Sequence, residues 1–496
     1  MPEFNFPTIY PIILLAAWAC VLLLVDLAIP KDRKGWTAVL AAVGLALTLG
    51  ISLVAPLQPE TGFNNMVVRD GFSGFLNALF ALIGLLGIAT GYGYIRRMGI
   101  ERGEYYSLIL FSVTGMMLMA QATDLIIVFL ALELLSIPLY VMAAFAYPKV
   151  DSEEAGIKYF LLGAFAGGFV VYGIALAYGA TGATSFAGIA AVIASGTIPD
   201  TTFAYNPLLL TIGAALILIG FGFKVATVPF HMWTPDVYQG APTSVTAFMA
   251  AGAKTAGFAA LLRVFASLFP SLAADLTPIL VVLSALTMIL GNVAAIAQTD
   301  IKRMLAYSSI AQAGYILMAF VSFGSPEVRA TSVASGLFYL VAYTLASFGA
   351  WAVVIMLERA DPATDVGQVG KGLQIADYAG LGRKYPALAT AMAVFMLSFI
   401  GLPPTLGLVG KVYLFRAALE GGFMVLAIIG VLTSLISAYY YLRVVVTMFM
   451  RDGDPQVTRE SWLEITVGAT ALLTVLVSLS PAILFEWASQ ALLKLF

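Results

Sequence analysis

The sequence predicts an all-α integral membrane protein with about fourteen transmembrane helices. Hydrophobic residues make up 61% of its 496 residues and charged residues only 10%, whereas soluble domains carry roughly a quarter charged residues. Apolar stretches of about 18 residues or more recur from end to end, and each can cross a hydrocarbon core of about 30 Å as a helix. Helices are expected because isolated strands leave their backbone groups unpaired in lipid.

The spans follow from the apolar runs between polar or proline-rich segments. The segment 386–419 is too long for one straight crossing, and Pro403-Pro404 interrupts it. Residues 184–196 are apolar but short, which indicates an interfacial or loop helix. The fourteen predicted spans are 8–29, 36–55, 72–95, 105–121, 125–147, 155–180, 207–230, 242–268, 276–297, 303–323, 331–357, 386–419, 422–448 and 461–487.

Basic residues indicate the orientation, because cytoplasmic loops of membrane proteins are enriched in lysine and arginine. With the amino terminus outside, 17 of the 25 lysines and arginines fall in cytoplasmic loops or at their edges. Both termini are therefore expected on the non-cytoplasmic side. The outer side receives only Arg69, Arg263, Arg329, Arg416 and Lys494.

Matching features in the two halves of the chain indicate an internal repeat. Asp124 precedes span 5 and Asp300 precedes span 10, while Pro229 breaks span 7 and Pro403-Pro404 breaks span 12. Five helices per repeat is an odd number, so the second copy must run the opposite way through the membrane. Inverted repeats with broken helices are typical of ion-translocating folds. The predicted parts are an amino-terminal three-helix segment (1–100), a first inverted repeat of helices 4–8 (101–272), a second of helices 9–13 (273–450) and a carboxy-terminal helix 14 (451–496).

Three lysines lie deep inside predicted spans and belong to neither side, at positions where a charge costs about 2.5–3.5 kcal/mol on insertion scales. Lys254 lies twelve residues into span 8, about 18 Å along a helix. Lys224 and Lys411 lie near the proline breaks, where water can reach buried backbone. Glu133 in span 5 is the one carboxylate that we expect to be clearly buried, so ion pairing cannot neutralise all three lysines. Burial without a counter-charge disfavours the ammonium form, as a reversible proton carrier requires.

The same charges have structural interpretations as well. They could pair with one another and tighten helix packing. If Glu133 pairs with Lys224, it holds that lysine protonated, and separating the two releases the proton. His231, the only histidine, either passes protons between the cytoplasmic entrance and the buried lysines or caps the broken helix after Pro229.

Other polar and small residues near these positions are interpreted structurally. Tyr238 and Asp236 are assigned as loop or interface residues. Gly163 and Gly167 form a GxxxG pattern, which favours close helix packing over chemistry.

The sequence lacks the motifs that bind nucleotides, haem, metals or iron–sulfur clusters. There is no dinucleotide-binding glycine motif after a strand, no Walker lysine loop, and no pair of histidines spaced to ligate haem or a metal. The single cysteine, Cys20, excludes a cysteine-ligated cluster within the chain. We therefore expect no cofactor, no metal and no nucleic acid bound by this chain.

The run from Gly220 to Thr243, which contains Lys224, Pro229, His231 and Trp233-Thr-Pro-Asp-Val-Tyr-Gln-Gly-Ala-Pro242, closely resembles the antiporter-like membrane subunits of respiratory complex I. That family is shared with multisubunit cation/proton antiporters and membrane-bound hydrogenases. The resemblance covers nearly the whole chain. It continues through Glu133–Tyr140, Gly252–Lys254, Asp300–Ser309, Gly401–Pro404 and Gly410-Lys411.

Within the family the chain resembles the N-type subunits of the bacterial proton-pumping NADH:quinone oxidoreductase. Three details carry this resemblance: the run Trp233–Pro242, Asp70-Gly-Phe-Ser73 before span 3, and lysine rather than glutamate at position 411. The resemblance implies a translocase subunit of the bacterial inner membrane with no redox chemistry of its own. FMN, iron–sulfur clusters and the NADH site would belong to partner subunits, both membrane-embedded and peripheral.

The resemblance also implies roles for the buried charges. Glu133 would be the modulating carboxylate, Lys224 the primary proton site, Lys254 the connection between the two halves and Lys411 the exit-side site. The nearest rival interpretation is a subunit of a cation/proton antiporter. A rival of another class is a stand-alone solute permease whose lysines bind an anionic substrate, and a third is a membrane scaffold.

Overall fold

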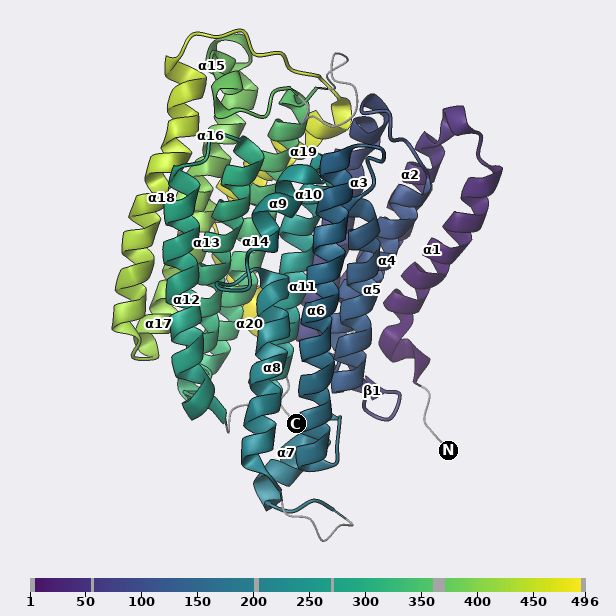
Figure 1. The fold of residues 1–496 in the computed structure, drawn as a ribbon, viewed down its shortest axis with the longest axis vertical. Helices are drawn as coiled ribbons and strands as arrows, with labels where there is room; N and C mark the ends of the chain where they lie inside the picture. Colours follow the sequence, from purple (N-terminus) through teal and green to yellow (C-terminus); the bar gives the residue numbers. More distant parts are fainter. Residues whose placement is uncertain (1–4, 55–57, 200–204, 269–271, 360–370, 492–496) are drawn as a thin grey trace.

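The chain folds into a bundle of long helices that run side by side, with short helices and loops at its two ends (Figure 1). The computed structural model describes residues 5–54, 58–199, 205–268, 272–359 and 371–491. Within these residues, twelve helices are long and apolar enough to cross a membrane. The expected spans 105–121 and 386–419 are not among the twelve, so the number fourteen stays a prediction. The all-α membrane fold itself is confirmed.

The amino-terminal part consists of three long helices and a small hairpin. Its two strands pair antiparallel, with Thr61 opposite Val68. Asp70 then starts the third helix through a capping box with Ser73, which satisfies free N–H groups at the helix start. The elements are η1 (Phe6–Ile9), α1 (Tyr10–Ala28), η2 (Lys31–Arg33), α2 (Gly35–Val54), β1 (Glu60–Gly62), β2 (Val67–Arg69) and α3 (Gly71–Arg97).

The next part contains the first broken helix. The helix expected over 207–230 ends at Val225, because Ala226 adopts a left-handed conformation (φ +63°) and the chain leaves the helix there. The expected short helix at 184–196 is present as α7. The elements are α4 (Glu104–Gln121), α5 (Leu125–Ala143), α6 (Val150–Thr181), α7 (Phe186–Ser195), α8 (Pro207–Val225), α9 (Trp233–Gly240), α10 (Thr243–Phe248), the π-helical turn η3 (Met249–Ala253) and α11 (Lys254–Leu268).

The remaining part contains the second broken helix. The expected long span 386–419 consists of two helices separated by residues 401–405, and Pro403-Pro404 lies in the break. Proline cannot continue the backbone hydrogen bonding of a helix, which explains the interruption. The elements are α12 (Ala273–Ile296), α13 (Ile301–Val321), α14 (Pro326–Leu357), η5 (Ile375–Tyr378), α15 (Leu381–Lys384), α16 (Pro386–Ile400), α17 (Leu406–Glu420), α18 (Met424–Met450), α19 (Ser461–Leu479) and α20 (Ala482–Gln490).

The two aspartates that suggested the repeat have the same local structure. Asp124 caps α5 and Asp300 caps α13, each by accepting a hydrogen bond from a backbone N–H of the first turn. Each aspartate also forms an isolated antiparallel bridge to a later segment, Asp124 with Ser185 and Asp300 with Gln374. This equivalence supports the predicted inverted repeat.

The first and last described elements lie at the same end of the bundle. Arg69 donates a hydrogen bond to the Pro7 carbonyl at 3.4 Å. Two residues further on, a Cβ at Gly71 would come within 2.8 Å of the Gln490 carbonyl oxygen. The chain therefore crosses the bundle an even number of times. Lys494, which we expected on the outer side, lies outside the described residues.

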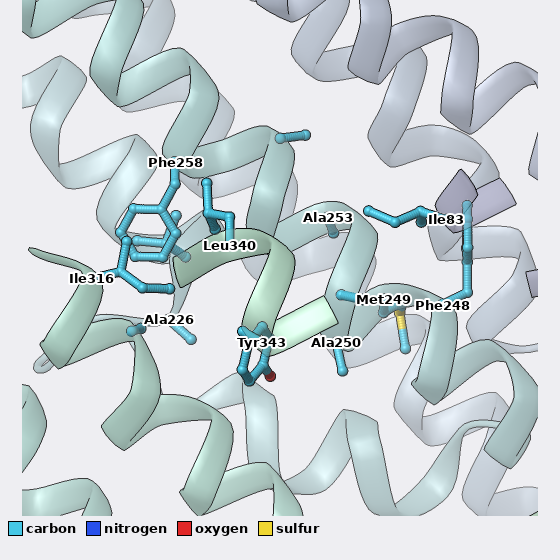
Figure 2. Close-up of a cluster of buried hydrophobic side chains, with 14 of the residues drawn as sticks. Ile83, Ala226, Phe248, Met249, Ala250, Ala253, Phe258, Ile316, Leu340 and Tyr343 are labelled. Atoms are coloured by element: carbon cyan, nitrogen blue, oxygen red, sulfur yellow. The ribbon is translucent and has the colours of Figure 1, made fainter. Parts of the chain in front are cut away.

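The centre of the bundle is formed by the segment containing α10, η3 and α11 together with α13 and α14. The apolar window of the first segment is 100% buried, whereas that of α19 is only 28% buried. Figure 2 shows part of this centre, where Phe248 lies near Ile83, and Phe258 lies near Ile316 and Leu340. The helix that carries Lys254 is therefore enclosed by protein on all sides.

Candidate functional site: three buried lysines

Lys224 lies in the last turn of α8 and is only 4% exposed. Its Nζ donates hydrogen bonds to Ser136 Oγ of α5 at 2.7 Å and to Tyr159 Oη of α6 at 3.2 Å. The ammonium also lies 5.3 Å from the ring centre of Tyr159 and 5.8 Å from that of Tyr140, within the range of cation–π attraction. Because α8 ends at the next residue, the ammonium lies directly before the helix break.

Glu133 lies on α5 opposite two glycines of α6. A Cβ at Gly167 would lie 3.1 Å from Glu133 Oε1, and a Cβ at Gly163 would lie 2.2 Å from Tyr140 Oη. The glycine pair therefore makes room for two polar side chains as well as allowing close helix packing. Glu133 is partly exposed and forms no ion pair with Lys224 in this structure, so the hypothesised direct pairing is absent.

Lys254 follows the π-helical turn η3 directly and is 2% exposed. Its Nζ donates short hydrogen bonds to both the carbonyl oxygen and the hydroxyl of Ser309 on α13. Tyr343 of α14 donates a hydrogen bond to the same hydroxyl at 2.8 Å, and its ring centre lies 5.8 Å from the ammonium. The hydrogen-bond partners of this lysine among the described residues are therefore neutral. π-Helical turns inside α-helices are frequent at functional sites.

Lys411 lies on α17, next to the second helix break. Its Nζ donates hydrogen bonds to the carbonyls of Phe399 (2.9 Å) and Ile400 (3.0 Å) and to the hydroxyl of Ser434. The ring centre of Tyr315 is 4.1 Å away. The two carbonyls end α16, where they lack intrahelical partners and carry partial negative charge. The break itself therefore supplies the groups that stabilise a buried ammonium.

Polar side chains extend from the Lys411 site toward the Lys254 site. Gln312 donates hydrogen bonds to the Phe399 carbonyl at 3.0 Å and to Tyr441 Oη at 3.3 Å. The hydroxyls of Tyr441 and Ser308 form a short hydrogen bond. Ser308 is the chain neighbour of Ser309, which binds the ammonium of α11. The two sites are therefore connected except for the step between these adjacent serines.

Aromatic residues of α9 lie between the Lys224 site and the Lys254 site. The ring of Tyr159 stacks on Trp233 with ring centres 4.6 Å apart. The ring centres of Trp233 and Tyr238 are 6.0 Å apart, and the Tyr238 hydroxyl interacts with Ser309 and Tyr343. Tyr238 is 1% exposed on α9 and its ring packs against Trp351 of α14, so it is a buried residue at an interface between helices and does not lie in a loop.

Asp236 lies on the other face of α9, where it joins two neighbouring helices. It pairs with Lys158 of α6 at 2.9 Å and with Arg303 of α13 at 2.8 Å. Burial raises the pKa of Asp236, but the hydrogen bonds from Arg303 and Lys158 outweigh this effect and hold the pKa below its usual value. Asp236 is therefore an interface residue, as expected.

His231 lies in the break between α8 and α9 and is half-buried. Its backbone carbonyl accepts the N–H of Thr234, while its Nδ1 has no hydrogen-bond partner among the described residues. No hydrogen bond joins the ring to the three lysines. The structure therefore places His231 near the first break but outside the lysine contacts described above.

Glu133 was expected to be the one clearly buried carboxylate, but five other acidic side chains among the described residues are more buried. They lie at the ends of helices, where the chain packs against the protein interior. Arg263, expected on the outer side, is one of their partners: it pairs with Asp70 at 2.6 Å, and each side chain is 1% exposed. None of these acids hydrogen bonds to Lys224, Lys254 or Lys411. The buried acids among the described residues are Asp26, Asp70, Asp124, Asp300 and Glu358.

Sequence reasoning missed the neutral partners of the lysines. Ser136 lies three residues after Glu133, a spacing that places both on one helix face, so this partner could have been considered. Ser309 and Ser434 had no such signal, because a serine inside a helix commonly bonds to its own backbone. Within the described residues, no group of three or more His, Cys, Asp or Glu side chains could hold a metal ion.

The chain matches known proteins over nearly its whole length. Residues 122–437 match the family described as NADH:quinone oxidoreductase/Mrp antiporter, transmembrane. The chain is 46% identical to NADH-quinone oxidoreductase subunit N of Chloroflexus aggregans over 100% of this chain and 99% of the relative. It is 44% identical to subunit N of Trichlorobacter lovleyi over 98% and 97% of the two chains.

Two solved structures have the same fold. A chain of respiratory complex I from Thermus thermophilus with bound aureothin is 34% identical, with a TM-score of 0.79 over 97% of this chain and 99% of that chain. A chain of the Mrp complex from Dietzia sp. superposes with a TM-score of 0.82 over 98% and 97% of the two chains, but at 19% identity it shows the fold alone. The chain therefore belongs to the NADH:quinone oxidoreductase/Mrp antiporter family of membrane proteins.

Proposed function

We propose that this chain is the N subunit of a bacterial proton-pumping NADH:quinone oxidoreductase and relays protons across the membrane. One observation carries the proposal: the buried ammonium groups of Lys224, Lys254 and Lys411 are each held by neutral hydrogen-bond partners, and polar side chains nearly connect the last two. A structural ion pair would need a carboxylate partner for each buried charge. The subunit N names of relatives with over 40% identity support the assignment within the family.

The proposed relay uses the lysines as successive carriers. Lys224 is the primary site, Lys254 connects the two halves and Lys411 is the exit-side site. Serine and tyrosine hydroxyls can each donate and accept a hydrogen bond, so the hydroxyls that contact the lysines can pass a proton as well as hold one, whereas Trp233 between the Lys224 and Lys254 sites only donates, to the Phe223 carbonyl. Glu133 modulates Lys224 electrostatically, and in this hypothesis moving the carboxylate further from the ammonium releases the proton. His231 is the proposed link to the cytoplasmic entrance.

The proposed organisation follows the repeat. Residues 101–272 and 273–450 form the two inverted halves, flanked by 1–100 and 451–496. The matching caps and bridges of Asp124 and Asp300 support this division. The distribution of basic residues supports an orientation with both termini on the non-cytoplasmic side of the bacterial inner membrane.

The proposed partners are the other membrane and peripheral subunits of the oxidoreductase. NADH oxidation and quinone reduction occur in those subunits, which carry FMN and iron–sulfur clusters. The energy of quinone reduction reaches this chain by conformational or electrostatic coupling. The chain contributes proton translocation without redox chemistry of its own.

Alanine substitution of the lysines tests the relay. Lys224→Ala and Lys411→Ala are made separately in the full complex, and NADH-driven acidification of inverted membrane vesicles is measured beside the amount of assembled complex. We expect both variants to assemble and to lose pumping. The control is Lys384→Ala, because Lys384 pairs with Asp454 at the surface. Wild-type pumping in both variants would contradict the relay.

A cation/proton antiporter subunit is the second candidate, favoured by the family description, which includes Mrp antiporters, and by the fold shared with the Mrp complex. Purification from the native membrane distinguishes the two: the proposed function expects a flavin subunit and iron–sulfur subunits to co-purify. A stand-alone permease would instead transport its solute when the purified chain is reconstituted by itself, where we expect no activity.

A further inference from the structure

A cavity lies at the end of the bundle opposite to the described termini. α3 begins beside Gln490 at the termini end, and Tyr94 lies 23 residues after Gly71, about 35 Å along the helix. The cavity beside Tyr94 is also lined by the acidic and basic side chains of Lys149, Asp151, Lys302 and Glu358. Neither the lysine relay nor the helix caps account for Glu358.

Glu358 follows the last residue of α14 and is 4% exposed. Its Oε1 accepts a hydrogen bond from Tyr94 Oη at 3.2 Å, and Tyr94 Oη in turn accepts the N–H of Thr243. Its Oε2 has no hydrogen-bond partner among the described residues. Tyr94 therefore orients the carboxylate while one oxygen stays able to accept a proton.

Lys302 lines the same cavity but does not neutralise Glu358 directly. Its Nζ donates a hydrogen bond to the Ala241 carbonyl at 2.7 Å, and no ion pair within 4 Å joins it to Glu358 among the described residues. The two charges are close enough to interact electrostatically. Packing alone would favour a direct, fully hydrogen-bonded pair, since an incompletely paired buried charge is costly. The separated arrangement therefore suits a site that binds and releases protons.

The other titratable groups that face these two charges come from several elements. They are Tyr94 of α3, Lys149 and Asp151 at the start of α6, Asp300 at the cap of α13 and Tyr378 of η5.

The cavity is close to the Lys254 site. Ala241 directly follows α9, three residues after Tyr238, whose hydroxyl interacts with Ser309. On α13, Lys302 precedes Ser309 by seven residues, about 10 Å along the helix. Ser309 holds the ammonium of Lys254. The two segments that line the cavity, the end of α9 and the start of α13, therefore both lead toward Ser309, the hydrogen-bond partner of Lys254.

We infer that this cavity is the proton uptake site on the cytoplasmic side, with Glu358 as the acceptor, and that it serves Lys254. Oε2 takes a proton from a hydronium ion, which leaves as water, and the protonated carboxyl then becomes a donor to the polar groups of the cavity. Lys302 stays bound to the Ala241 carbonyl and favours the charged form of Glu358 from a distance, so it promotes release of the proton once it has been taken up. This inference rests on the proposed function, since it supplies protons to the same relay.

Glu358→Gln in the full complex tests the inference, because it keeps the shape and the bond to Tyr94 but cannot take up a proton. We expect normal assembly and a rate of NADH-driven vesicle acidification lower by about tenfold or more, a conservative figure beside the roughly hundredfold effect of a positioned proton-transfer group. Glu358→Asp keeps a carboxylate and should retain most of the pumping. The control is Asp452→Asn, since Asp452 is an exposed acid paired with Arg383.

The outcomes separate this inference from the proposed function. If Glu358→Gln pumps at the wild-type rate while Lys224→Ala does not, the uptake site is wrong and the relay stands. If Lys224→Ala and Lys411→Ala also pump normally, the proposed function fails as well. If Glu358→Asp and Glu358→Gln lose assembly equally, Glu358 is structural and the inference is overturned.

Access from water gives a second test that does not depend on pumping. Lys149→Cys, at a half-exposed position that lines the cavity, is made in a Cys20→Ala background, because Cys20 is the single cysteine of the chain. A membrane-impermeant maleimide should label the new thiol in inverted vesicles, where the cytoplasmic face is outside, and not in right-side-out vesicles. Labelling only from the opposite face would overturn the inference.

Discussion

The ammonium of Lys224 is bound to the hydroxyl of Ser136 at 2.7 Å and not to a carboxylate. A neutral hydroxyl stabilises the charge of the ammonium less than a carboxylate does. The lysine can therefore bind a proton and still release it. The same principle applies to Lys254 and Lys411, whose hydrogen bonds go to serine hydroxyls and backbone carbonyls. The hydrogen bonds of the three lysines therefore go to neutral groups, while the carboxylate of Glu133 acts on Lys224 electrostatically without a direct ion pair.

Ser136→Ala should impair pumping without preventing assembly. The change removes a hydrogen bond to a charged group, worth about 1.5–3 kcal/mol, and leaves Tyr159 as the hydrogen-bond partner of Lys224. We expect NADH-driven vesicle acidification to fall by about tenfold, since about 1.4 kcal/mol corresponds to a factor of ten. Ser478→Ala is the control, because that hydroxyl bonds only to its own helix. Equal pumping in the two variants would show that the bond does not matter.

Gln312→Leu should disconnect the Lys254 and Lys411 sites. Leucine fills similar space but cannot donate to the Phe399 carbonyl or to Tyr441. We expect vesicle acidification to fall by about tenfold with the amount of complex unchanged. Replacing the exposed Gln456 by leucine is the matched control, and a Gln312 variant indistinguishable from it would rule out this route.

Breaking the buried pair of Asp70 and Arg263 should destabilise the chain without a specific effect on pumping. Removing one partner leaves the other charge buried and uncompensated, at a cost of about 3–5 kcal/mol. We expect Asp70→Asn and Arg263→Met each to lower the Tm of the detergent-solubilised complex. The double variant should recover part of the loss, because neither charge then remains. Additive losses in the double variant would mean that the two side chains are not coupled.

Asp236 should make a pH-dependent contribution to stability. Its pKa is lowered because hydrogen bonds from Arg303 and Lys158 outweigh the effect of burial, and α9 lies outside the membrane spans. The contribution is fully present above the pKa of an unfolded aspartate, about 3.9, and is lost as pH falls through the lower folded-state pKa. For such a partly exposed group we expect about 1 kcal/mol or less.

The measurement for Asp236 compares the Tm of the wild-type complex and of Asp236→Asn between pH 7 and pH 3. The difference between them should be constant from pH 7 to about pH 5 and should shrink toward zero below about pH 4. A difference that grows as the pH falls would contradict the assignment of the ion pairs as stabilising.

Local features of the sequence predicted much of the architecture. The two broken helices were predicted because proline acts on its own backbone and on the preceding turn. Even so, α8 ends at Val225 rather than near Pro229. Ala226 adopts a left-handed backbone conformation that depends on tertiary packing, and the conformational preference of alanine does not predict it. The sequence also left open whether Tyr238 lies in a loop or at an interface, because the packing of the short helix α9 against its neighbours decides this.

The hydrogen-bond partners of the buried lysines come from distant parts of the chain, so the sequence around each lysine could not identify them. Lys224 and Ser136 are 88 residues apart in sequence, and Lys254 and Ser309 are 55 apart. Hydrophobic periodicity reports whether a position is buried, but it carries no information on which helix lies opposite. The expected pairing with Glu133 therefore had the right helix, α5, and the wrong residue on it.

The sequence by itself determined that this is a multi-pass helical membrane protein with three lysines deep within its spans, two of them beside broken helices. Composition, span length and proline position can be read from short stretches of the sequence. The energy of placing each stretch in a membrane also depends mainly on the residues of that stretch. Only the tertiary structure decided that the lysines are bound by neutral groups, and that Glu358 keeps one oxygen unpaired beside Lys302. The physical reason is that hydrogen bonds act over about 3 Å, a distance that only the packing of helices far apart in sequence can set.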